Sequence, residues 1–135
     1  MELMNYAIHK ETHNIICYGA SSIYNSFRLT LNDEVVCISA ETFYREYIPI
    51  DDHMDGYEFF KVLLLLIDEK YSLTRIPSNR DYVNEDLLII QNQDKVIFMM
   101  RNKNTGYITV SCTMSQYHTP NYIGVFNILK EEGVI

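Results

Sequence analysis

Two histidines separated by three residues are the first candidate for chemistry in this chain. His9 and His13 flank Glu11 in the stretch HKETH. Side chains four residues apart share one face of a helix, and two imidazoles placed in this way can chelate zinc. The glutamate does not directly follow the first histidine, however, as the zinc-protease signature requires. We therefore interpret the stretch as an exposed polar turn between two strands, predict no metal there, and expect its histidines to contribute little to stability.

A second candidate is the stretch DDHMDG, which begins at Asp51 and is similar in pattern to the start of a calcium-binding loop. Acids at its first and fifth positions and glycine at its sixth fit that pattern. The third position is His53, however, and the twelfth, where a bidentate glutamate belongs, is Val62. The acids are better explained as capping groups at the start of a helix, where carboxylates suit the positive end of the helix dipole.

The three cysteines show no sign of catalytic use. Cys17, Cys37 and Cys112 lie in apolar, strand-like surroundings without basic neighbours that would lower a thiol pKa. Their odd number and wide spacing predict reduced thiols of a cytoplasmic protein rather than a disulfide framework. His118 follows Tyr117 at an expected junction between a strand and a helix, where a structural role is the default. We predict no catalytic residue, no metal and no cofactor; a hydrolase whose site is assembled only by the fold is the alternative, which a bound metal would favour.

The charge of the chain is concentrated in one segment. The 135 residues have a net charge of −7, and residues 33–69 contain ten acids and two bases. A protein that binds nucleic acid would show the opposite sign. The beginning of the sequence, MELMNYAIHK, lacks the basic region and apolar block of a signal peptide. The longest apolar run, Val62 to Ile67, is far shorter than the roughly 20 residues of a membrane span. We therefore expect a cytoplasmic protein that binds neither nucleic acid nor membrane.

Tyrosines alternate with carboxylates in the acidic segment, and together they form our candidate site. Tyrosine buries a large area at a low entropic cost and is common at binding hot spots. Carboxylates attract a cationic partner and speed its encounter. The alternative is a solvated acidic surface that only keeps the protein soluble. The predicted partner-binding residues are Glu41, Tyr44, Glu46, Tyr47, Asp51, Asp52 and Asp55.

These features predict a non-enzymatic protein that binds a basic protein partner. The role that fits best is a bacterial immunity protein, which neutralises a basic toxin, possibly a nuclease, by covering its active site. A small acidic secretion chaperone is the alternative among binding proteins. Oligomeric state, together with the identity of the adjacent gene, would distinguish the two.

One apolar stretch organises the expected fold. In residues 59–67 the only charged residue is Lys61, and the apolar residues cover nearly the whole circumference of a helix. We expect a buried central helix at about 53–71. A second helix is expected at about 120–132, with Thr119 as its N-cap, Pro120 at its first position, and Tyr122, Phe126 and Leu129 on its apolar side.

Strands are expected on both sides of the central helix. Residues 4–8 with 14–18, and 27–31 with 35–39, alternate as hairpins, the second pair around a turn at Asn32 and Asp33. Residues 87–90 and 96–100 are apolar throughout and predict strands covered on both faces, and residues 107–114 alternate. Glu41 to Tyr47 is expected to form either two helical turns or an aromatic loop, and Ser72 to Glu85 a long loop. The order predicts an α+β protein of one domain, residues 1–135, with a mainly antiparallel sheet packed against two helices.

Overall fold

The computed structural model describes residues 5–77 and 86–135 and confirms the α+β class. The described residues form two five-stranded antiparallel sheets and three helices. The chain divides into two compact units, Met1–Asp52 and His53–Ile135, each of which contains one sheet. The expectation of a single domain stays a prediction.

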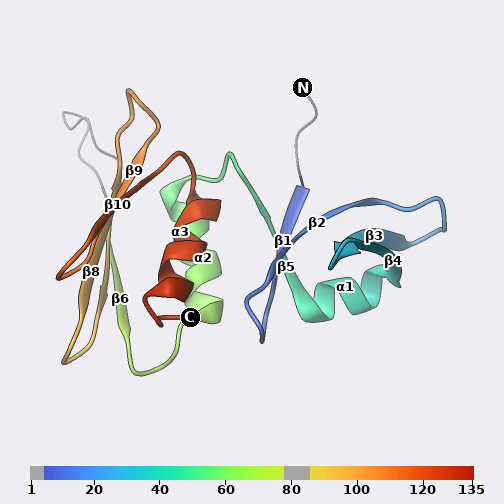
Figure 1. The fold of residues 1–135 in the computed structure, drawn as a ribbon, viewed down its shortest axis with the longest axis horizontal. Coiled ribbons are helices and arrows are strands. Elements are labelled where there is room, and N and C mark those ends of the chain that lie inside the picture. The colour runs from blue at the N-terminus through green and yellow to red at the C-terminus, as the bar shows by residue number, and fades with distance from the viewer. Residues whose placement is uncertain (1–4, 78–85) are drawn as a thin grey trace. The chain divides into compact units, whose positions relative to one another are not determined.

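The first unit is a meander of strands closed by one short helix (Figure 1). Its strand order is β4-β3-β2-β1-β5, so β4 and β5 are the two edges of the sheet. The elements are β1 (Asn5–His9), β2 (Ile15–Ala20), β3 (Ser26–Leu31), β4 (Glu34–Ser39), α1 (Ala40–Glu46) and β5 (Tyr47–Asp51).

The two hairpins expected in this unit are confirmed. β1 pairs with β2, and β3 pairs with β4 across the two-residue turn of Asn32 and Asp33. Both turn residues have positive φ, 48° and 66°. Asparagine and aspartate tolerate this left-handed conformation, and a turn of this kind matches the twist of the flanking strands.

The core of the first unit forms because alternate strand residues face α1. Ser39 caps this helix, since its side chain accepts a hydrogen bond from the backbone N–H of Thr42. The stretch that sequence left open between helix and loop is therefore a helix, and it buries Phe43 completely. The buried cluster is Ala7, Ile16, Leu29, Phe43 and Tyr47, with Tyr18, Phe27, Leu31 and Ile38 packed against it.

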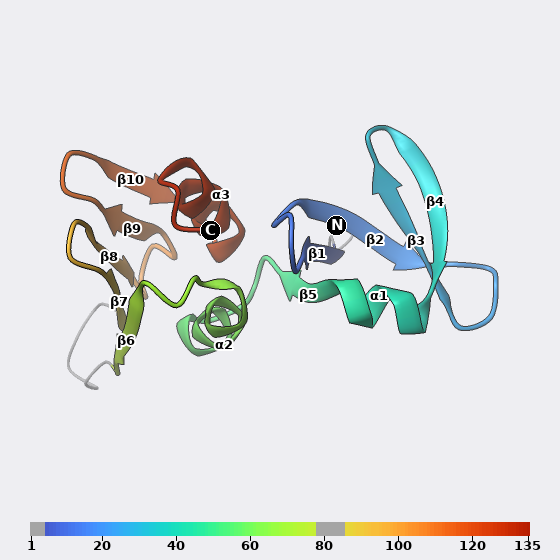
Figure 2. The ribbon, with the colours of Figure 1, turned by 90° about the horizontal axis from the view of Figure 1, so that it is seen from below.

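The second unit places two helices on one face of its sheet (Figure 1 and Figure 2). Its strand order is β10-β9-β8-β7-β6. The elements are α2 (Gly56–Leu66), β6 (Ser72–Ile76), β7 (Leu87–Gln91), β8 (Val96–Arg101), β9 (Ile108–Ser111), β10 (Gln116–Thr119) and α3 (Tyr122–Glu131). The ring of Phe59 on α2 contacts those of Tyr122 and Phe126 on α3, with centroid distances of 4.6 and 4.8 Å.

The central helix is shorter than expected and is buried on one side only. α2 ends at Leu66 and buries Phe59, Leu63 and Leu66, which recur at helical spacing. Leu64 and Leu65 are 51% and 72% exposed. The predicted bounds of 53–71 and the burial on all sides are therefore wrong. Apolar composition around the whole circumference indicates what a helix is able to bury, while the neighbouring elements decide which side is covered.

The C-terminal helix is confirmed, but it begins two residues later than expected. Asn121 is its N-cap and accepts the backbone N–H of Gly124 at 3.2 Å. Thr119 belongs to β10, and its hydroxyl donates to the carbonyl of Asn121. The predicted cap at Thr119 is therefore wrong, because this residue pairs with Ile108 in the sheet. The expected apolar side of the helix, which includes Tyr122 and Phe126, is buried.

The strands of the second sheet also differ from expectation in their coverage. β7 and β8 form, but Phe98 and Met100 of β8 are exposed while Ile97 and Met99 are buried. Coverage on both faces is therefore wrong, since α2 and α3 lie on the same face (Figure 1). Sequence also missed β6, β10 and, in the first unit, β5. The expected loop at 72–85 begins with β6 instead, and its residues 78–85 lie outside the described residues.

His9 has contacts that the expectation of an exposed turn did not include. Its Nδ1 accepts the backbone N–H groups of Glu11 and Thr12, both at 3.1 Å, and its ring packs edge-on against Tyr47 at 4.9 Å. The premise that this residue makes few contacts is therefore wrong. We expect His9→Ala to lower the free energy of unfolding by about 1–2 kcal/mol. Urea denaturation checks this, with Glu11→Ala as an exposed control expected to change it by less than about 0.5 kcal/mol.

Candidate partner-docking surface

The residues suggested for metal binding have structural roles. Nδ1 of His9 is occupied by two backbone N–H groups. Asp55 is the N-cap of α2, and its Oδ1 accepts the backbone N–H of Glu58 at 2.8 Å. Within residues 5–77 and 86–135, no group of three or more histidine, cysteine or acidic side chains is arranged to hold a metal ion.

The cysteines are free thiols in three different settings. Cys37 is exposed on β4, with its sulfur 3.7 Å from the hydroxyl of Ser21. Cys112 is half-buried, and burial, followed by the charge of Glu132, raises the pKa of its thiol. A raised pKa disfavours the thiolate that a nucleophile requires. His118 bonds Thr109 on the neighbouring strand at 3.2 Å, which is a contact within the sheet.

Aromatic rings reach the surface where α1 covers the first sheet. Phe27 lies between two tyrosines, with its ring centroid 5.6 Å from Tyr18 and 5.7 Å from Tyr44, and both contacts are edge-on. The ring of Phe43 lies in the core beneath these three rings, with its centroid 4.6 to 5.2 Å from theirs. Tyr44 is 55% exposed. A large, rigid and accessible ring is therefore held in place by packed neighbours, as a binding anchor requires.

Two exposed carboxylates belong to the same unit as these tyrosines. Glu41 precedes Tyr44 by three residues on α1, so the two side chains share one side of the helix. Asp51 and Tyr47 are four residues apart on β5, so their side chains lie on the same face of the strand, and Tyr47 faces α1. The pKa of Tyr18 is raised by burial first, and then by the charges of Tyr44 and Asp51. The structure thus brings Tyr18, Glu41, Tyr44 and Asp51 together, and we name these four residues the Tyr44 surface.

The predicted site residues fall into three groups. Glu41, Tyr44 and Asp51 are exposed in the first unit, as a docking surface requires. Tyr47 is a core residue whose ring stacks on Phe43, so it stabilises the fold. The rest are Asp52, half-buried at the end of the first unit, Asp55, which caps α2 in the second unit, and Glu46.

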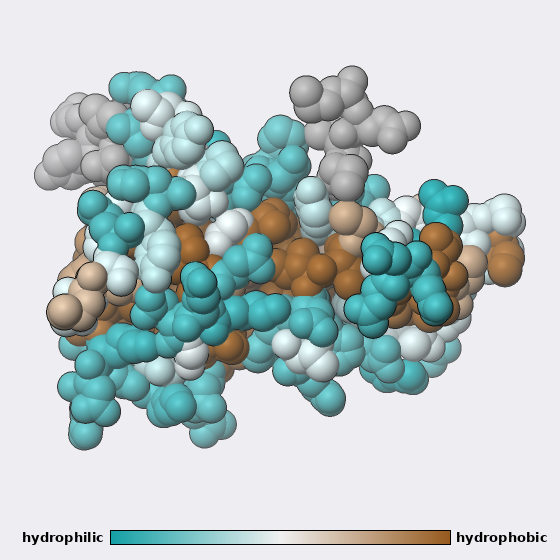
Figure 3. Space-filling model, in the orientation of Figure 1, coloured by the Kyte–Doolittle hydropathy of each residue, from teal (hydrophilic) through white to brown (hydrophobic). Residues whose placement is uncertain are grey.

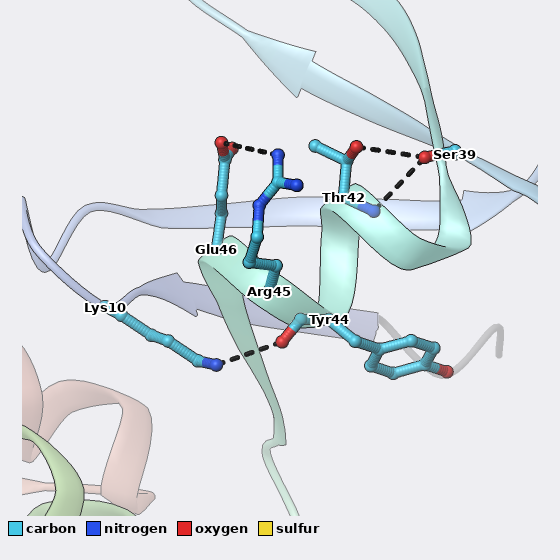
Figure 4. A network of polar contacts seen from close by, with 6 residues as sticks. All are labelled: Lys10, Ser39, Thr42, Tyr44, Arg45 and Glu46. Atoms are coloured by element: carbon cyan, nitrogen blue, oxygen red, sulfur yellow. Dashed lines mark hydrogen bonds and ion pairs between the residues drawn. The ribbon is translucent and has the colours of Figure 1, made fainter.

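Basic side chains neutralise one end of α1. Arg45 lies 3.8 Å from Glu46, and the ammonium of Lys10 donates to the carbonyl oxygen of Tyr44 at 3.0 Å (Figure 4). The phenol ring of Tyr44 points away from both bases (Figure 4). The negative charge of Glu46 is therefore offset locally by Arg45.

Sequence reasoning missed Tyr18. This residue lies on β2, on the same face as buried Ile16, and fifteen residues before the acidic segment begins. The signal that was available is the strand register, since Asn5 pairs with Asp51 on one side of β1 while β2 lies on the other. Placing Tyr18 beside α1 requires the order of the strands as well, which local patterns do not give.

The acidity of the chain belongs mainly to the first unit. In its described part, residues 5–52, there are seven acids and three bases, while residues 53–77 and 86–135 contain eight acids and seven bases. Apolar side chains reach the surface among larger polar areas on the face drawn in Figure 3. No helix in the described parts of the chain has the length and apolar character needed to cross a membrane. Comparison with protein-family models, with curated proteins and with solved structures found no match for this chain.

Proposed function

We propose that this chain is a non-enzymatic binding protein whose first unit docks a basic protein through the Tyr44 surface. The observation that carries the proposal is Tyr44 itself, an exposed aromatic ring held by packed neighbours in the unit that also exposes Glu41 and Asp51. Lysine and arginine side chains bind well to such a combination, because the ring face attracts cations and the carboxylates pair with them.

The finer form of the proposal is a bacterial immunity protein that neutralises a basic toxin. A nuclease toxin carries basic residues around its active site in order to bind phosphates, and an acidic surface is complementary to them. The excess of acids in the first unit supports this form of the proposal.

The proposal predicts different kinetic effects for charges and rings. Long-range attraction acts before contact and is screened by salt, whereas aromatic packing forms only after docking. We expect Asp51→Lys or Glu41→Lys to slow association several-fold and to flatten its salt dependence. Tyr44→Ala should instead speed dissociation about tenfold or more, if the ring is a hot spot worth at least ~1.4 kcal/mol.

The experiment begins with the captured partner. The chain is immobilised, bound proteins are identified by mass spectrometry, and the purified partner is measured by surface plasmon resonance at several salt concentrations. Glu131→Lys is the matched control, because it changes the net charge equally on the exposed side of α3 in the second unit. Wild-type kinetics for all three variants of the Tyr44 surface would show that this surface is only a solubility device.

A further inference from the structure

The four edge strands in the described part of this protein differ in how they are protected. An edge strand exposes unpaired N–H and C=O groups that pair readily with another chain, and proline is one of the devices that prevents this. The chain has three prolines. Pro49 lies within β5, Pro77 directly follows β6, and Pro120 directly follows β10. Each of these edges therefore has a proline within the strand or directly after it, and the fourth edge, β4, has neither.

The geometry of β5 shows how such protection works. The carbonyl of Glu46 accepts the backbone N–H of Lys10, so these two residues form a hydrogen-bonded pair of the β1–β5 ladder. Pairs alternate along an antiparallel ladder, so the nitrogen of Pro49 points away from β1, toward the free edge. Its missing N–H is therefore one that a further strand would need.

β4 has the opposite character. Its sequence EVVCIS is rich in β-branched residues and has one charge, at Glu34. Val35 is 64% exposed and Val36 is 39% exposed, and Cys37 is exposed as well. A six-residue edge strand without proline, lysine or bulge is the kind that natural proteins normally avoid leaving open.

The backbone groups that β4 offers can be identified from its pairing with β3. The backbone N–H of Ala40 donates to the carbonyl of Asn25, which marks a hydrogen-bonded pair at the end of this hairpin. By alternation, Val36 is bonded to β3, while the N–H and C=O groups of Val35 and Cys37 point to the free edge. In the described parts of the chain no other group hydrogen-bonds these outward groups.

We propose that β4 pairs with β4 of a second copy of this chain, in antiparallel orientation, and joins the two first sheets into one. The two-fold axis passes through Val36, which faces Val36 of the second copy. Val35 then lies opposite Cys37 of the second copy, and Cys37 lies opposite Val35 of the second copy. Each of these pairs exchanges two backbone hydrogen bonds, which gives about four in all. The interface is isologous, because the same strand is used on both sides.

In this register β4 is complementary to itself, because its outward backbone groups match those of a second copy. Two chains of net charge −7 repel each other at long range, so a contact between copies has to keep like charges apart. In this register Glu34 lies opposite Ile38 of the second copy, and Asp33 lies opposite Ser39. Like charges directly opposite each other destabilise a sheet, and this pairing has none. Because the interface is small, we expect a dissociation constant between about 5 µM and about 1 mM.

Sedimentation velocity of the whole chain, from about 1 µM to about 1 mM, tests the pairing. We expect a monomer–dimer equilibrium that Val35→Lys weakens at least about tenfold, since lysine on an edge opposes pairing. Thr30→Lys is the matched control, because Thr30 is the exposed partner of Val35 on β3 and adds the same charge away from the edge. Circular dichroism and thermal melts check that both variants are folded.

A second pair of variants tests the register. In a Cys37→Ser background, Val36→Cys brings two sulfurs together at a non-hydrogen-bonded pair, with Cα atoms about 4.5 Å apart, which a disulfide can span. Val35→Cys in the same background leaves its copies diagonal at about 7–8 Å and should crosslink more slowly. The bond is located by mass spectrometry of unreduced peptides.

Each outcome decides the proposal. A concentration-dependent dimer that is weakened by Val35→Lys, kept by Thr30→Lys and crosslinked through position 36 supports it. A wild-type chain that stays monomeric up to about 1 mM overturns it. So does a dimer that Val35→Lys leaves intact, or one that crosslinks no faster at position 36 than at position 35, because the contact would then lie elsewhere.

Discussion

Leu63→Ala is expected to lower the free energy of unfolding by about 2–5 kcal/mol, the usual cost of removing a leucine from a packed core. Leu63 is fully buried on α2, in line with Phe59 and Leu66. The substitution leaves a cavity that rigid neighbours fill only in part, so the loss includes both the apolar transfer of the side chain and its missing contacts. Urea denaturation measures the change as a lower midpoint at a similar slope.

The neighbouring Leu64 provides a matched control. It lies on the same helix and is 51% exposed, so Leu64→Ala has the same change in helix propensity with little loss of packing. We expect this variant to change stability by less than about 1 kcal/mol. Equal losses at the two positions would mean that α2 is rotated relative to the sheet from the orientation described.

Gly124→Ala is expected to be the most disruptive change of a small residue. A Cβ at this position would lie 1.9 Å from the hydroxyl oxygen of Thr119 and 2.9 Å from its Cβ. Thr119 is buried and bonded to the carbonyl of Asn121, so it has little room to move. Replacing glycine with alanine within a helix normally stabilises it by up to about 1 kcal/mol. Overpacking costs about 1–3 kcal/mol, and here we expect it to win.

Two further variants separate the causes of this loss. Gly19→Ala is the control for an open position, because no heavy atom beyond its own residue and its two chain neighbours lies within 4 Å of a Cβ built there. Thr119→Gly combined with Gly124→Ala removes the atoms in conflict, so the added cost of the alanine should largely disappear in that background. Thermal melts and urea titration of the wild type, Thr119→Gly, Gly124→Ala and the double variant complete a double-mutant cycle. Additive losses at positions 119 and 124 would show that the two residues do not meet.

Local patterns predict the strands whose partners are adjacent in sequence. Both hairpins of the first unit could be read from alternation, and the turn at Asn32 and Asp33 supplies residues that tolerate its dihedral angles. The strands β7, β8 and β9 follow from their apolar residues. These elements are predictable because each is specified by its own residues and those a few positions away.

The missed strands lack such a signal. β5 has the sequence YIPID, in which proline argues against a strand unless the strand is known to be an edge. β6 and β10, with sequences SLTRI and QYHT, have few apolar residues because each is also an edge. Their strand conformation is imposed by pairing with β7 and β9, which is tertiary information.

The candidate site was predicted only in part, because part of it also depends on tertiary information. Exposed acids and tyrosines can be recognised from composition, and Glu41, Tyr44 and Asp51 are exposed. Sequence could not separate Tyr44 from Tyr47, which lie three residues apart, because the end of α1 falls between them. The change from helix to strand turns one ring outward and the other into the core.

The position of α3 along the chain has a consequence for synthesis. The inner face of the second sheet is covered by α2, made before the strands, and by α3, made after all five. α3 buries Tyr122, Phe126 and Leu129 fully or almost fully. Their partners in the second unit therefore stay uncovered until α3 has been made, while translation continues at about 5–20 residues per second. The first unit has no such delay, since its last strand precedes the second unit in the chain. During translation the nascent second unit is therefore the part most exposed to chaperones and to aggregation.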